Sequence, residues 1–336
     1  MSRLSSVALL LLLVLVGPIL IDAAPETPYR VHRAQLRQDL QYARDIGALE
    51  ARLTGAARAP EIQRFELRSR HFVFGMPRIV DDRHFGSAGP GISVVVREGF
   101  VAAHFENMRV PLWVCQRWTR TELDRMRAVE SLGRDWYDDP DLPPALHAGT
   151  SYRGSETELD RGHMARHSMN RAWGVNSSIY GCLMTNCAPQ HRSVNRGSAY
   201  RTLEDAIVDF TDLPEQVEVL WTITGTVFSR DGDPEDFTRI VRITSGFGVP
   251  HATYKIVAWF GPDGAFHARG YLFEQPHRLG ASGMPVFTIP DQRRPLSSFN
   301  VPLRVIEART GVEFFPRLHP NLATSLKSTV QDAPWN

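Results

Sequence analysis

Short runs of β-branched and aromatic residues recur through the chain and limit its fold more than any other feature. These runs occupy 92–96, 100–105, 112–115, 217–228, 240–243, 254–260 and 268–273. Turn-forming clusters separate several of them, as at 231–234 and 261–264. Strand-length runs between such turns predict an antiparallel sheet with short connections. A helix is predicted over 302–308, where Gly311 supplies a stop.

Composition excludes several other classes of protein. Of the 336 residues, 43% are hydrophobic and 22% are charged. These values are typical of a globular chain and rule out a disordered, collagen-like or coiled-coil protein. The net charge of +1 provides no global field that attracts polyanions, so any nucleic-acid contact must come from a local basic site. All basic residues except Lys255 and Lys327 are arginine, which suits bidentate phosphate binding.

The N-terminal segment 1–23 has the layout of a signal peptide: Arg3, an apolar run, and small residues at Ala23 and Ala24. About 15 apolar residues reach roughly 22 Å, less than the roughly 30 Å needed to span a bilayer. We therefore expect a secreted or periplasmic protein without stable membrane association. An uncleaved anchor is the alternative.

The rest of the chain is divided into three parts. Segment 24–71 is a helical extension, since apolar residues recur at helical spacing over 36–53; 72–320 is the main domain, and 321–336 is a C-terminal tail. The stretch 135–154 is rich in Asp, Pro and Gly and is predicted to be an exposed loop. The tryptophans Trp113, Trp221 and Trp259 lie in predicted strands, so we assign them to the core.

Three cysteines allow at most one disulfide within the chain. They are Cys115, Cys182 and Cys187. Cys182 could pair with Cys187 or with Cys115, and buried free thiols are the equal alternative. No CxxC or Cys/His ligand spacing is present, which argues against a structural zinc site.

Residues that carry chemistry are concentrated between 152 and 204. In chain order they are Tyr152-Arg153-Gly154-Ser155, Asp160-Arg161-Gly162-His163, Asn186-Cys187-Ala188-Pro189-Gln190, Asn195-Arg196-Gly197 and Leu203-Glu204. Together they resemble the DNA/RNA non-specific endonuclease family of the ββα-metal superfamily, which includes endonuclease G. The tetrapeptide ending at His163 and the nine-residue step from Asn186 to Asn195 carry the match. The resemblance extends weakly over 72–318.

This resemblance implies an α+β fold in which a central antiparallel β-sheet is flanked by helices. A ββα-metal finger would place His163 on its strand side and Asn195 near the start of its helix. The implied activity is that of an exported, metal-dependent endonuclease. It would hydrolyse the phosphodiester bonds of DNA and RNA with little sequence specificity, leaving a 5′ phosphate and a 3′ hydroxyl.

The residue types fit that chemistry. A neutral imidazole, with a pKa near roughly 6.5, can deprotonate water, so His163 is the candidate general base. A hard dication beside the phosphate stabilises the charge that develops there. The resemblance implies one largely hydrated Mg²⁺, with Mn²⁺ as an alternative, held by the Asn195 amide oxygen.

Three further roles follow from the resemblance. Glu204 would accept hydrogen bonds from water on the ion, and Arg161 would clamp the phosphate through its guanidinium. Arg153 is a plausible neighbour of Arg161 on the preceding loop. Asp160 would fix the loop geometry.

The spacing departs from the family pattern at one point. In the family the helix glutamate follows the asparagine by eight positions, whereas Glu204 follows Asn195 by nine. On one unbroken helix at about 100° per residue, that step would turn the two side chains about 180° apart. The apolar stripe Tyr200, Leu203, Ile207 and Phe210 begins late, and Gly197-Ser198 resembles a turn and an N-cap. We therefore place the extra residue before the helix, with Asn195 on the loop or a distorted first turn, and keep Asp205 as the alternative to Glu204.

A second departure is Val208, where the family commonly has an arginine. Arg192, Arg196 or Arg201 could supply that charge, and we assign Arg153, Arg196 and Arg201 to substrate binding. His167 is structural or lies at the substrate rim, because no HExxH motif accompanies it. Asn186, Pro189 and Gln190 are expected to shape the connection between strand and helix.

Two rival functions remain open at the level of sequence. One is a catalytically weakened protein with the nuclease fold that binds nucleic acid. The other is an exonuclease restricted to one nucleic acid.

Overall fold

The computed structural model describes residues 70–335, apart from 86–90, 131–134, 148, 150–157, 214, 231–239, 244–245, 263 and 331–333. The predicted leader 1–23, the helix expected over 36–53 and the substrate residue Arg153 lie outside the described residues. No helix in the described part is both long enough and apolar enough to cross a bilayer.

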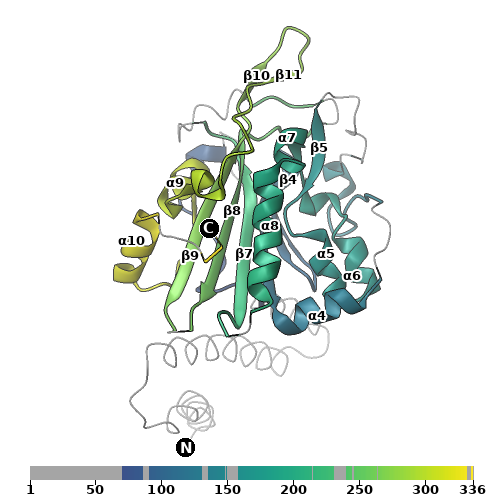
Figure 1. Cartoon of the computed structure of the whole chain (residues 1–336). Helices are drawn as coiled ribbons and strands as arrows, with labels where there is room; N and C mark the ends of the chain where they lie inside the picture. Colours follow the sequence, from purple (N-terminus) through teal and green to yellow (C-terminus); the bar gives the residue numbers. More distant parts are fainter. Residues whose placement is uncertain are drawn as a thin grey trace, which may run out of the picture.

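A seven-stranded antiparallel sheet forms the centre of the molecule (Figure 1). In spatial order its strands are β12 (Asn300–Val301), β9 (Phe266–Glu274), β8 (Ala252–Phe260), β7 (Val219–Val227), β4 (Val110–Thr119), β3 (Val101–Phe105) and β2 (Ile92–Val96). Each neighbouring pair is antiparallel. The predicted α+β class and the antiparallel sheet are therefore confirmed.

One predicted strand is wrong. Segment 240–243 contributes only an isolated bridge between Arg242 and Gly248. The amide of Ile243 donates to the carbonyl of Phe247, and the amide of Gly246 donates back to Ile243. The backbone of this run therefore pairs with the nearby residues 246–249 instead of joining the sheet.

The remaining elements lie around the sheet. The longer helices are α4 (Arg120–Ala128), α8 (Ser198–Thr211), α9 (Leu303–Thr310) and α10 (Pro320–Ser328), and the shorter are α5 (His167–Asn170), α6 (Val175–Tyr180) and α7 (Arg192–Asn195). Two-stranded pairs are β1 (Arg78–Ile79) with β13 (Val312–Glu313), β5 (Leu159–His163) with β6 (Cys187–His191), and β10 (His277–Leu279) with β11 (Pro285–Phe287). Short 3-10 helices are Asp82–Phe85, Pro144–Leu146, Arg171–Trp173, Met184–Asn186 and Leu296–Phe299.

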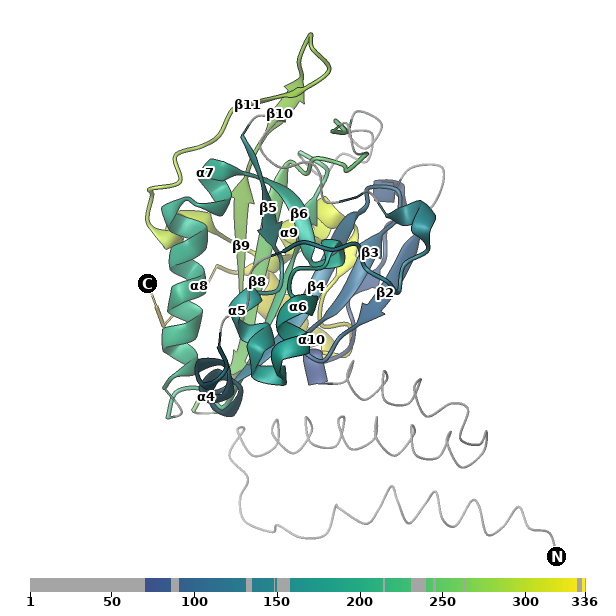
Figure 2. The same cartoon turned by 90° about the vertical axis from the view of Figure 1, so that its right-hand side faces the viewer.

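The two faces of the sheet are covered by different helices (Figures 1 and 2). Because side chains alternate along a strand, β8 directs Val257 and Trp259 to one face and Tyr254 and Ile256 to the other. The first face packs under α8, whose apolar stripe Tyr200, Leu203, Ile207 and Phe210 is buried as predicted.

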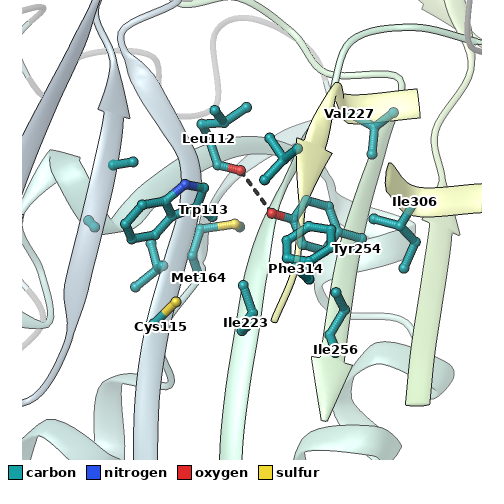
Figure 3. Close-up of a cluster of buried hydrophobic side chains, with 14 of the residues drawn as sticks. Leu112, Trp113, Cys115, Met164, Ile223, Val227, Tyr254, Ile256, Ile306 and Phe314 are labelled. Atoms are coloured by element: carbon teal, nitrogen blue, oxygen red, sulfur yellow. Dashed lines mark hydrogen bonds between the residues drawn. The ribbon is translucent and has the colours of Figure 1, made fainter. Parts of the chain in front are cut away.

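The opposite face packs against α9 and the segment after it. Figure 3 shows Tyr254 and Ile256 meeting Ile306 and Phe314, with the Tyr254 hydroxyl donating to the Leu112 carbonyl at 3.2 Å. The predicted helix over 302–308 is α9, and it ends at Gly311 in the left-handed region, with φ of 68°. A Cβ at Gly311 would also lie 2.4 Å from the Asp81 carbonyl, so this position requires glycine.

Packing continues beyond residue 320. Leu326 of α10 is buried in the core, and Lys327 pairs with Glu307 of α9 at 2.8 Å. The Trp335 ring contacts that of Phe210 edge-on and lies tilted against that of Trp259. The segment set apart as a tail, 321–336, therefore includes residues that belong to the packed fold.

Several core assignments hold. Trp113, Trp221 and Trp259 are buried, as expected for core residues. All three cysteines, Cys115, Cys182 and Cys187, are buried free thiols.

Candidate active site

A strand pair followed directly by helices builds the candidate site. β5 and β6 are antiparallel, and their register runs from Leu159 opposite His191 to His163 opposite Cys187. The chain leaves β6 straight into α7 and then α8. The strand–strand–helix arrangement expected of a ββα finger is present, with His163 at the end of β5 and Asn195 at the end of α7.

The extra residue between Asn195 and Glu204 is absorbed in a break between two helices. α7 ends at Asn195, and Gly197 is the N-cap of α8 with extended dihedral angles of φ −64° and ψ 157°. A Cβ at Gly197 would lie 1.8 Å from the Ser193 carbonyl, so only glycine fits there. The helix carrying Glu204 does start after the insertion, as predicted. Asn195, however, ends a separate helical turn instead of lying on a loop or on the first turn of α8.

An open cleft of about 910 Å³ brings the predicted residues together. Its lining includes His163, Arg161, Glu204, Asn195, Arg196 and Arg201, which are all the predicted site residues that the structure describes. The other lining residues are Trp136, Glu158, Leu159, Asp160, Arg166, His167, Ser168, Arg192, Tyr200 and Asp205.

His163 is half-buried and surrounded by specific groups. Its ring centroid lies 4.5 Å from that of Trp136 and 5.3 Å from that of His167. Its Nε2 lies 4.0 Å from the Cys182 sulfur. The Arg161 guanidinium carbon sits 5.0 Å from the centroid of the same Trp136 ring. Trp136 therefore contacts both the candidate base and the candidate phosphate clamp.

Sequence reasoning missed Trp136 because it lies in the stretch 135–154, predicted to be an exposed loop. In its described part most residues are exposed or half-buried, as predicted, but Asp139 is 1% exposed and pairs with Arg97. Thr185 donates to the Asp139 carboxylate at 2.5 Å. Because Asp139 is buried among hydrogen-bonding partners, this part of the loop, which includes the neighbouring Trp136, is held in place. The feature of the sequence that could have identified Trp136 is an aromatic residue next to a run of acidic residues.

Asp160 joins the strand to the helical turn that carries Asn195. Its carboxylate accepts from Asn195 Nδ2 at 3.1 Å and from Arg196 Nε at 2.7 Å. Partial burial raises the pKa of the Asp160 carboxyl, but hydrogen bonds from Arg196 and Asn195 and the charges of Arg196 and Arg192 outweigh it and hold that pKa below its ordinary value. Asp160 thus fixes loop geometry, as expected, and we call this contact set the Asp160 latch.

Glu204 is held from the sheet side. Its Oε1 lies 3.2 Å from Nζ of Lys255, a β8 residue whose side chain is 2% exposed. Arg166 donates to the Glu204 backbone carbonyl and, at 3.0 Å, to the Asp205 carboxylate. Asp205, the alternative candidate, is 53% exposed and so is the less constrained of the two acids.

Exposed arginines line the cleft, and each is paired with a carboxylate of the same lining. Arg192, Arg196 and Arg201 have side-chain exposures of 56%, 71% and 75%. Arg166, which sequence reasoning missed, reaches α8 beside Glu204. With Val208 in place of the family's arginine, Arg166 supplies a guanidinium at the same helix. The feature of the sequence that could have identified Arg166 as a site residue is its position three residues after His163.

Asn186 and Gln190, two of the residues expected to shape the connection between strand and helix, make buried hydrogen bonds to neighbouring segments. Asn186 donates from Nδ2 to the carbonyls of Ala165 and Gly181 at 3.0 and 2.9 Å, and it accepts from the Ala165 amide. Gln190 donates to the Thr253 hydroxyl of the sheet at 3.1 Å. His167 is 5% exposed and lies against His163 within the cleft.

The donor set fits a hard, hydrated dication. Because Asn195 Nδ2 donates to Asp160, its Oδ1 is oriented as the free acceptor of that amide. An amide oxygen, the Glu204 carboxylate and space for water in an open cleft suit Mg²⁺, which keeps several water ligands. No group of three or more His, Cys, Asp and Glu side chains with metal-binding geometry occurs within the described residues.

Fold and cleft together define an α+β protein with a polar, arginine-rich site beside a ββα finger. A model of the DNA/RNA non-specific endonuclease family matches residues 83–321, more than half of the chain. The chain therefore belongs to the DNA/RNA non-specific endonuclease family, and it is a nuclease, that is, a phosphodiesterase. The family is metal-dependent.

Individual relatives agree with this membership. Nuclease C1 of Cunninghamella echinulata var. echinulata is 25% identical over 238 residues, which cover 70% of this chain and 87% of that protein. Mitochondrial endonuclease G of Homo sapiens is 26% identical over 235 residues, covering 68% and 72%. A crystal structure of the EndoG/EndoGI complex, which concerns EndoG inhibition, matches with a TM-score of 0.54 and 23% identity, covering 68% of this chain and 89% of that one. That last likeness bears on the fold alone.

Proposed function

We propose that this chain is an exported, magnesium-dependent endonuclease that cleaves DNA and RNA with little sequence preference. The observation that carries the proposal is the convergence of His163, Asn195, Glu204 and a rim of arginines on one cleft. A polyanionic substrate needs such a rim, since the net charge of +1 offers no general attraction.

His163 acts as the general base. It removes a proton from a water molecule that attacks phosphorus, the bond from phosphorus to the 3′ oxygen breaks, and that oxygen takes up a proton from another water molecule in the cleft. The products then carry a 5′ phosphate and a 3′ hydroxyl. Ring contacts with Trp136 and His167 restrict the orientation of the imidazole, which lowers the cost of reaching the reactive geometry.

Asn195 Oδ1, together with water, would hold the cation, and the Asp160 latch fixes the amide through its Nδ2. When bound, a divalent cation stabilises the negative charge that develops on the phosphate and the leaving oxygen. Mg²⁺ is the proposed ion and Mn²⁺ the alternative. Glu204 accepts hydrogen bonds from water in the cleft through the carboxylate oxygen that Lys255 does not engage.

Arg161 binds the scissile phosphate, and Arg196 and Arg201 bind flanking phosphates. Arg153 is proposed as a further phosphate contact. Guanidinium groups recognise phosphate without reading bases, so sequence preference is expected to be weak.

Export and domain organisation complete the proposal. We infer that 1–23 is a cleaved signal peptide, so that the mature enzyme is secreted or periplasmic and not membrane-bound. The extension 24–71 precedes the nuclease domain, 72–320.

The test is digestion of supercoiled plasmid, linear DNA and RNA by purified mature protein, with and without EDTA. We expect cleavage of all three substrates in MgCl₂ and none in EDTA. H163A should abolish most cleavage while leaving the circular dichroism spectrum unchanged; R293Q, an exposed arginine outside the cleft lining, is the control. Intact DNA under both conditions would favour the binding-protein alternative, and resistance of the circular plasmid would favour an exonuclease.

A further inference from the structure

Lys255 is conspicuous because it is one of only two lysines in an arginine-rich chain, and it lies in the sheet. It occupies β8 opposite Thr224 of β7 and Tyr271 of β9, so hydrogen-bonded strands flank it on both sides. By the alternation that directs Val257 and Trp259 under α8, Lys255 faces α8 as well. Its side chain is 2% exposed.

A buried ammonium group needs compensation. Transfer of an unpaired charge from water to a protein interior is very costly, so lysine at such a site indicates a specific anionic partner. Glu204 provides it through Oε1 at 3.2 Å, and the Tyr200 ring lies beneath Nζ with its centroid at 4.9 Å. Burial lowers the pKa of Lys255, while the charge and hydrogen bond of Glu204 oppose that shift.

The same contacts reach the strand that carries the candidate base. Tyr200 donates its hydroxyl to the His163 backbone carbonyl at 3.1 Å while its ring faces Lys255. Lys255, Tyr200 and Glu204 thus connect the rigid sheet, the first turns of α8 and the end of β5. This connection fixes α8 relative to His163 independently of the helix break at Gly197.

We propose that Lys255 is a positioning residue that holds the Glu204 carboxylate in its working orientation in the cleft. This inference rests on the proposed function. Glu204 has several rotatable bonds, and an untethered carboxylate would lose rotamer freedom each time it engaged the cleft. Lys255 engages Oε1, so the second oxygen of Glu204, a residue that lines the cleft, stays available to groups in the cleft. A compact ammonium fits this buried site, whereas a branched guanidinium requires more donors to be satisfied.

The test compares K255M with K327M. Both replace a lysine that pairs with a glutamate, but Lys327 pairs with Glu307 on α9, outside the cleft lining. K255M should lower kcat by about 10- to 100-fold and weaken Mn²⁺ binding, measured calorimetrically without substrate, by about tenfold, because supporting residues around a metal site have effects of that size. KM for DNA should change little, and K327M should leave kcat and Mn²⁺ affinity at wild-type values.

Coupling to Glu204 is measured with E204Q and the double variant E204Q/K255M. If Lys255 acts through Glu204, the double variant will be no less active than E204Q alone. Multiplying losses, or a folded K255M with wild-type kcat and Mn²⁺ affinity, would overturn the proposal. K255Q, which keeps a donor without the charge, should retain more activity than K255M; failure of both variants to fold would assign Lys255 to folding instead. EDTA-sensitive cleavage by the wild-type protein tests the proposed function separately, since it does not depend on any Lys255 variant.

Discussion

Asp160→Ala should raise the Mg²⁺ concentration that the enzyme needs, because Asp160 orients the amide of Asn195. Asp160 is 15% exposed in its side chain and accepts from Asn195 Nδ2 at 3.1 Å. A hydrogen bond to a charged group contributes about 1.5–3 kcal/mol. At about 1.4 kcal/mol per factor of ten, loss of that bond corresponds to a 10- to 100-fold weaker metal site, which agrees with the usual effect of outer-shell partners.

Arg196→Gln removes the ion pair that Asp160 also makes but keeps the hydrogen bond from Asn195. Comparing the two variants therefore separates the contributions of these two contacts to metal affinity. Arg196 is 71% exposed, so its pair with Asp160 is worth about 0–1 kcal/mol and its removal should shift metal affinity by less than about fivefold. The assay is the initial rate of plasmid cleavage against MgCl₂ concentration, with calorimetric Mn²⁺ binding beside it. The reasoning would be refuted if both substitutions weakened metal affinity equally, or if Asp160→Ala left the MgCl₂ concentration at half-maximal rate unchanged.

Three other perturbations test packing and electrostatics. Trp136→Leu removes the ring that contacts His163 and Arg161, and the loss of about 0.5–1.5 kcal/mol for each of the two contacts should lower kcat/KM by about 5- to 150-fold in the same cleavage assay. Leu203→Ala, at a fully buried position of α8, should lower the free energy of unfolding by about 2–5 kcal/mol in urea titrations, and a loss below 1 kcal/mol would contradict the burial. Burial holds the pKa of His104 at about 4, so the unfolded chain binds more protons below pH 6.5 and stability is lost as the pH falls from there. His104→Leu should therefore flatten the decline of unfolding free energy between pH 6 and pH 4.5 by up to about 1.4 kcal/mol per pH unit; an unchanged slope would show that His104 titrates normally.

Local pattern was sufficient to predict most of the fold. Strands such as β8 and β9 are apolar runs that the sheet buries on both faces, so periodicity and turn residues located them. The run 240–243 is also rich in β-branched residues. Its Ile243 nevertheless forms hydrogen bonds with the nearby Gly246 and Phe247 instead of with a strand of the sheet. Composition cannot distinguish a strand of the sheet from a locally paired segment, because the difference depends on which backbone groups lie nearby in the folded chain.

The candidate site was predicted only where its residues lie within one motif. His163, Arg161, Asn195 and Glu204 are close in sequence, and the motif spacing brought them together. Trp136 and Arg166 line the cleft, and Lys255 contacts Glu204 from the sheet, through tertiary packing. The insertion before Glu204 could be placed from the apolar stripe of α8, whereas the short helix α7 depends on a close backbone approach at Gly197 that the sequence alone does not reveal.

The central claim is that one hydrated dication binds at Asn195, next to His163. Anomalous diffraction from crystals soaked in MnCl₂, collected at the manganese edge on an inactive H163A variant, measures this directly. We predict a single strong peak in the cleft, beside Asn195 Oδ1. A peak coordinated elsewhere, or none at Asn195 under conditions in which the wild-type protein digests DNA, would contradict the account.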